Sequence, residues 1–163
     1  MKYLLLVFFF LCTYTSHGQC VSVKELRAMF FKDMEAQDSY LEARGYAVSY
    51  SSASVGIEWT NKRTGQQVTV DNDKLGSVWQ VSYFLHTSKS CYDQLRAQLA
   101  SLGLTKDDQF YNSYGELYYF YSNSKYGVEI HKWTKEDSRV FYKIAVLRKQ
   151  DYWEEIQSVK NPG

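Results

Sequence analysis

The same succession of helix and strand signals occurs twice along the chain. This repeated order constrains the fold more than any single motif. A capping box, with Ser22 at the N-cap and Glu25 three residues later, opens a helical spacing of apolar residues that Gly45 ends. A second helical segment begins near Ser90 and ends at Gly103. Each glycine is followed by short strand-like runs: 46–50, 55–60, 66–70 and 78–86 in the first half, and 106–111, 116–122, 127–133 and 139–148 in the second.

This order predicts an α+β fold: a tandem helix-plus-four-strand repeat, in which an antiparallel sheet has two helices on one face. We expect a single domain over 19–149, built of two repeats at about 19–88 and 89–149. A C-terminal tail follows at 150–163. Its aromatic residues predict a short helical turn or a frayed end that packs one ring against the domain.

The first eighteen residues have the layout of a secretory signal peptide. Lys2 is followed by an unbroken apolar run at 4–11, and the small residues Ser16 and Gly18 precede position 19. A buried N-terminal strand or helix is the alternative, but it does not require this order of features. We therefore expect cleavage of residues 1–18 and an exported product, periplasmic or secreted. No later segment approaches the roughly 20 apolar residues of a membrane-spanning helix, so we expect no transmembrane segment in the mature chain.

The charge balance excludes one large class of partner. Removing Lys2 with the signal leaves 19 − 1 = 18 Lys and Arg residues against 18 Asp and Glu residues. Proteins that bind nucleic acid need a basic surface, because they neutralise phosphates. A neutral chain with scattered positive charges is therefore not expected to bind nucleic acid.

Cys20 and Cys91 are the cysteines that remain after residue 18. In an exported protein an even pair predicts a disulfide, and the alternative is two unpaired thiols. No CxxC motif or cluster of cysteine and histidine accompanies them, so the sequence predicts no metal site and no cofactor.

Residue alternation in the strand-like runs predicts a mixed polar and aromatic face on the sheet. Every second residue of a strand points to the same side, and an antiparallel sheet can leave one side in water. We expect this open face to bind a protein, peptide or glycan, which makes the chain a non-catalytic binding or interaction protein. The predicted binding residues are Glu58, Gln80, Ser82, Tyr118, Phe120, Glu129, His131 and Trp133.

Two other functions remain open. Glu129 and His131 lie two residues apart, hence on one face of a strand, and an acid beside an imidazole is the minimum for general acid–base chemistry. They are the catalytic candidates of the first alternative, a small secreted hydrolase, although no hydrolase motif accompanies them. The second alternative is a structural component of the cell envelope.

The predicted order of elements, with helices at 22–45 and 90–103 each followed by four strands, resembles the β-lactamase inhibitory protein family. Members of that family are exported bacterial proteins with tandem α-β4 repeats, whose aromatic-rich concave sheet grips a partner enzyme. The resemblance spans the mature chain and implies a binding role for the sheet. It assigns no residues, because no motif of the family is matched and its inter-element disulfides have no counterpart here.

Overall fold

The computed structural model describes residues 20–52, 55–73 and 75–161, so the predicted signal peptide at 1–18 lies outside the described residues. Within these ranges the helices and strands confirm the α+β class. The helices are α2 (Val23–Met29), α3 (Met34–Glu42), α4 (Lys89–Ser101) and α5 (Tyr152–Lys160). The strands are β1 (Tyr46–Ser52), β2 (Gly56–Asn61), β3 (Gln67–Asn72), β4 (Val78–His86), β5 (Thr105–Tyr111), β6 (Leu117–Ser122), β7 (Tyr126–Thr134) and β8 (Val140–Arg148).

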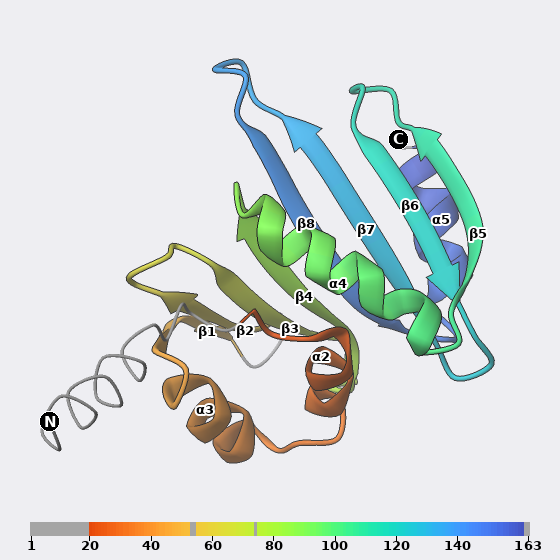
Figure 1. The fold of residues 1–163 in the computed structure, drawn as a ribbon. Coiled ribbons are helices and arrows are strands. Elements are labelled where there is room, and N and C mark those ends of the chain that lie inside the picture. Colours follow the sequence, from red (N-terminus) through yellow and green to blue (C-terminus); the bar gives the residue numbers. More distant parts are fainter. Residues whose placement is uncertain (1–19, 53–54, 74, 162–163) are drawn as a thin grey trace, which may run out of the picture.

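The strands form one antiparallel sheet in the order β1-β2-β3-β4-β8-β7-β6-β5. Each half of the chain is a four-stranded meander, and the two meanders join where β4 pairs with β8 in the middle of the sheet (Figure 1). Val81 lies opposite Val146 at this junction, and both side chains are fully buried. The last strand of each half therefore carries the contact that unites the domain.

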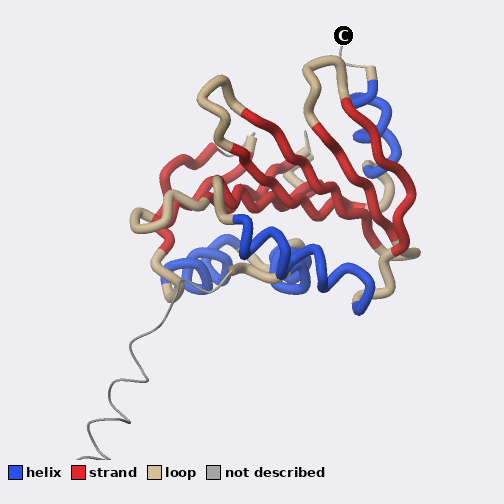
Figure 2. The backbone as a smooth tube through the Cα atoms, turned by 45° about the horizontal axis from the view of Figure 1, so that its top comes forward, coloured by secondary structure: helices blue, strands red, loops and turns tan. Residues whose placement is uncertain are grey.

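Helices cover both faces of the sheet, whereas the sequence predicted two helices on one face. α2, α3 and α4 lie on one side, which we call the inner face, and their side chains Leu26, Leu41 and Leu95 belong to one core. α5 lies on the opposite, outer face (Figure 2), where Tyr152 and Ile156 join a second, smaller core. The segment predicted as a C-terminal tail is thus a packed helix.

The single helix predicted between Ser22 and Gly45 is two helices. The capping box at Ser22 is present, with the Glu25 N–H donating to Ser22 Oγ and the Ser22 N–H donating to Glu25 Oε2. Asp33 then caps a new helix, because its Oδ1 accepts from the N–H of Ala36 at 2.8 Å. The buried Gln37 fixes the break, since its Nε2 donates to carbonyl oxygens at the end of α2 and in the turn.

A strict tandem repeat is not confirmed. The two halves share the four-stranded meander, and the predicted strand 78–86 agrees with the observed β4, Val78–His86. However, the first half has α2 and α3 where the second has α4, and α5 has no counterpart among the described residues of the first half.

A disulfide joins Cys20, just before α2, to Cys91 in the first turn of α4. Their Cα atoms lie 5.6 Å apart, within the usual range for such a bridge. The bond ties the start of the described chain to a helix 71 positions later. Among the described helices, none combines the length and the apolar character needed to cross a bilayer.

Candidate ligand-binding site

The outer face predicted to be open is in large part covered. Trp79, Phe110 and Val159 surround a cluster in which α5 packs on β6 and β8. The prediction of an open binding face is therefore wrong for its buried members, because residues 150–163, predicted as a tail, include a helix that packs on part of this face. These buried members are Gln80, Ser82, Tyr118, Phe120 and Glu129. Those that keep partial exposure are Glu58, His131 and Trp133.

Glu129 lies in a buried ionic cluster beneath α5. Its side chain is 1% exposed, and its Oε1 forms an ion pair with Lys143 Nζ at 3.1 Å. Glu155 of α5 faces the same group, and burial, followed by the negative charge of Glu129, raises the pKa of Glu155 above its usual value. A buried ion pair of this kind contributes to the stability of α5 packing with either sign. Because the carboxylate is buried, a substrate has little access to it.

His131 has different partners from Glu129. Its ring stacks between Tyr118, at a centroid distance of 4.1 Å, and Trp133, at 4.5 Å. Its Nε2 lies 3.3 Å from Oε2 of Glu116. Burial lowers the pKa of His131, although Glu129 and Glu116 act in the opposite direction. Glu129 thus pairs with Lys143 and His131 with Glu116, so the two catalytic candidates of the hydrolase alternative do not form an ion pair with each other.

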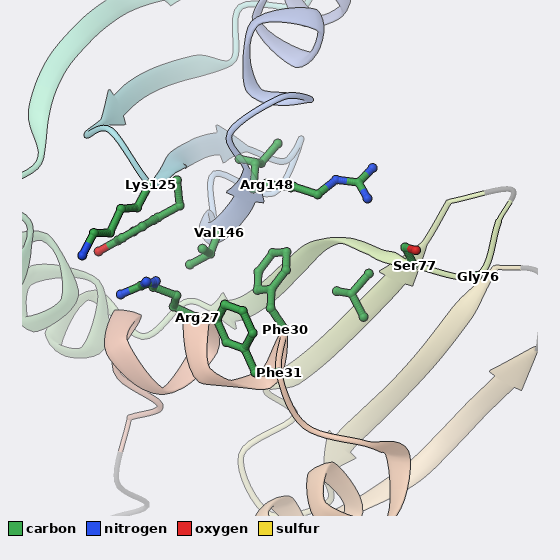
Figure 3. A pocket seen from close by; sticks show the side chains of 11 residues that line it. Arg27, Phe30, Phe31, Gly76, Ser77, Lys125, Val146 and Arg148 are labelled. Atoms are coloured by element: carbon green, nitrogen blue, oxygen red, sulfur yellow. The ribbon is translucent and has the colours of Figure 1, made fainter.

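A cavity of about 500 Å³ opens on the inner side of the sheet, at the end of α2 (Figure 3). We call it the α2 pocket. Phe30 and Phe31, from the end of the helix, form one apolar wall. Val78 of β4 and Val146 of β8 contribute to the opposite wall, so the pocket lies over the junction between the two meanders.

The break between α2 and α3 creates this wall. Phe30 is the C-cap of α2, and Phe31 follows it in a turn. The N–H of Phe31 donates to the carbonyl oxygen of Ala28. Because Gln37 holds the carbonyl groups of Met29 and Lys32, this turn has a defined shape. The Phe31 side chain remains 80% exposed at the pocket.

Three basic side chains line the pocket, and they have different environments. Figure 3 shows the nitrogen ends of Arg27 and Lys125 on one side and the Arg148 guanidinium directed away at the other. Arg148 is neutralised, because it forms ion pairs with Asp73 and Asp151. Arg27 instead places its guanidinium over the ring of Tyr126, 4.7 Å from the centroid.

The sequence did not predict the α2 pocket, because its walls come from four segments that are distant along the chain, at 27–31, 76–78, 125–126 and 146–148. One signal was present. Phe30 and Phe31 are adjacent, and a helix that buries one face cannot bury two consecutive large side chains equally. One ring of such a doublet must lie away from the core unless another element covers it.

Comparison with protein-family models, with curated proteins and with solved structures found no match to this chain. In the part of the chain that the structure describes, no three His, Cys, Asp or Glu side chains are arranged to hold a metal ion. The chemistry of the site therefore carries the functional conclusion, because a fold alone does not determine function.

Proposed function

We propose that this protein is an exported, non-catalytic ligand-binding protein whose binding site is the α2 pocket. The function class is the one predicted from the sequence, but the proposed site moves from the outer face to the inner side of the sheet. The observation that carries the proposal is a cavity of about 500 Å³ bordered by a Phe31 side chain that is 80% exposed. Pockets for small ligands have volumes of about 300–1,000 Å³ and mostly apolar walls.

The surroundings of the pocket support preorganised binding. Asp73 accepts hydrogen bonds from the N–H groups of Leu75 and Ser77, which restrains these two residues beside the pocket. Gln37 orders the opposite border, at the end of α2. A site held between ordered segments needs less rearrangement on binding, so less of the binding energy is lost.

Export is part of the same proposal. The order of charge, apolar run and small residues at 1–18 supports it, and so does the bridge between Cys20 and Cys91, because disulfides persist in oxidising compartments. N-terminal sequencing of the secreted protein is expected to begin near residue 19. Retention of the uncleaved chain inside the cell would count against export.

The binding site can be tested by NMR on the purified, disulfide-bonded protein. Benzoate, indole and benzylamine serve as small anionic, neutral and cationic probes. We expect at least one of them to shift the amide signals of Phe30, Phe31 and Val146, and we expect Phe31→Ser to weaken that binding without lowering the melting temperature.

Tyr114→Ser is the matched control. Tyr114 is a similarly exposed aromatic residue, at 75%, but it lies in the turn between β5 and β6 and does not line the pocket. Its replacement should leave probe binding unchanged. Absence of shifts at the pocket with all three probes, or equal loss in both variants, would contradict the proposed site.

A further inference from the structure

We infer that the α2 pocket selects ligands with one negatively charged head and an apolar body. This inference rests on the proposed function and adds the chemical class of the ligand. Two features of the pocket carry it: the uneven distribution of its positive charges, and walls that contain no acidic side chain among the described residues.

The positive end of the pocket is formed by Arg27 and Lys125. Within the described ranges, neither side chain has a carboxylate oxygen within ion-pair distance, whereas Arg148 has two such partners, Asp73 and Asp151. The Tyr126 ring beneath Arg27 restrains its guanidinium without neutralising it. An anionic group at this end would therefore meet two cations that have no internal counter-charge.

The rest of the pocket is suited to hydrocarbon. Beyond the positive end lie Phe30, Phe31, Val78 and Val146, and the volume of about 500 Å³ is sufficient for a ligand of ordinary small-molecule size. Because Arg148 is occupied by its own carboxylates, the opposite end offers no second anion site. The pocket is thus polarised, with one charged end and one apolar body.

Decanoate and decyltrimethylammonium test this class directly, because they share a chain of similar length and carry opposite charges. Isothermal titration at concentrations below micelle formation should show decanoate binding at least tenfold more tightly. A charge-assisted hydrogen bond contributes enough to change affinity by about tenfold or more. We therefore expect Arg27→Met and Lys125→Met each to weaken decanoate binding about tenfold and not to weaken the binding of decyltrimethylammonium.

Lys62→Met provides the control variant, since Lys62 is an exposed turn residue that does not line the pocket. It should bind decanoate as the unaltered protein does. Vesicles of phosphatidylcholine with phosphatidylglycerol form a further arm that separates a free amphiphile from an anionic lipid in a bilayer. We expect no sedimentation of the protein with these vesicles.

The outcomes separate the ligand class from the proposed function. Equal binding of both amphiphiles, or decanoate binding that is insensitive to Arg27→Met and Lys125→Met, would overturn the anion inference and leave the pocket as a binding site. Binding to vesicles alone would overturn the choice of a free ligand. If none of the probes binds at the pocket, the proposed function itself is refuted.

Discussion

Replacing Gly127 with alanine should loosen α5 from the outer face of the sheet. Gly127 lies in β7 beneath the ring of Tyr152, and a Cβ at this position would stand 2.0 Å from Cδ2 and 2.5 Å from Cγ of that ring. Carbon atoms do not approach this closely, so the ring must move. The backbone of Gly127 itself tolerates alanine, because it is not among the glycines with positive φ.

The cost follows from what the Tyr152 ring contacts. The ring is 0% exposed and packs edge-on against Phe120, and its hydroxyl donates to Oδ2 of Asp107 at 2.7 Å. Overpacking a core typically destabilises by about 1–3 kcal/mol. A lost hydrogen bond to a charged group adds about 1.5–3 kcal/mol. Alanine in a strand recovers about 0.5–1 kcal/mol relative to glycine. We expect a net loss of about 3 kcal/mol in the free energy of unfolding.

A double-mutant cycle isolates this contact. Urea unfolding of the unaltered protein, Gly127→Ala, Tyr152→Ala and the double variant gives the coupling energy between the two positions. Tyr152→Ala alone should cost about 3–5 kcal/mol, as the removal of a large buried aromatic side chain does. In its background Gly127→Ala should be neutral or slightly stabilising. Additive losses would refute the reasoning, because they would place the cost of alanine somewhere other than the Tyr152 ring.

Two further predictions concern α5 and the disulfide. The raised pKa of Glu155 means that the folded chain keeps a proton that the unfolded chain releases near pH 4.5, so stability should fall as pH rises from there through the folded pKa. Glu155→Gln should therefore raise the melting temperature at pH 7 by a few degrees and have less effect at pH 4. Replacement of the exposed Glu154 with Gln should change the melting temperature at neither pH. Equal effects of the two substitutions at pH 7 would contradict the burial argument. Replacing Cys20 and Cys91 with serine opens a loop of 71 positions, which should cost about 4 kcal/mol and lower the melting temperature by about 10–15 °C. A reductant should lower the melting temperature of the unaltered protein to the same extent, and a melting temperature that ignores both treatments would contradict a stabilising bridge.

Local sequence patterns correctly predicted most strands and the N-cap of the first helix. The run 78–86 alternates strongly, and β4 has those bounds. Ser22 and Glu25 lie three apart, and they form the capping box that this spacing predicts. Such features succeed because strand alternation and helix capping depend on residues a few positions apart, which contact one another in almost any tertiary setting.

The start of α3 and the helix at the C-terminus each depend on a local signal together with a packing contact. Asp33 is a strong N-cap residue, and it ends the predicted helix early by starting α3. Tyr152, Ile156 and Val159 have the spacing of an amphipathic helix, but part of the surface that this helix packs against comes from β6, which is distant along the chain. In the first case the contacts of Gln37 decide between one helix and two. In the second case the outer face of the sheet decides between a tail and a packed helix.

By itself the sequence determined the α+β class, the strand positions and the capped start of the first helix, because periodicity and capping are local. Only the tertiary structure decided which parts of each face of the sheet the helices cover. The 0% exposed ring of Tyr152 lies over Gly127, a contact between residues 25 positions apart that no local pattern specifies. The α2 pocket has the same origin, since Phe31, Lys125 and Val146 meet only after β4 pairs with β8. Burial depends on long-range packing, and therefore the location of the proposed binding site does as well.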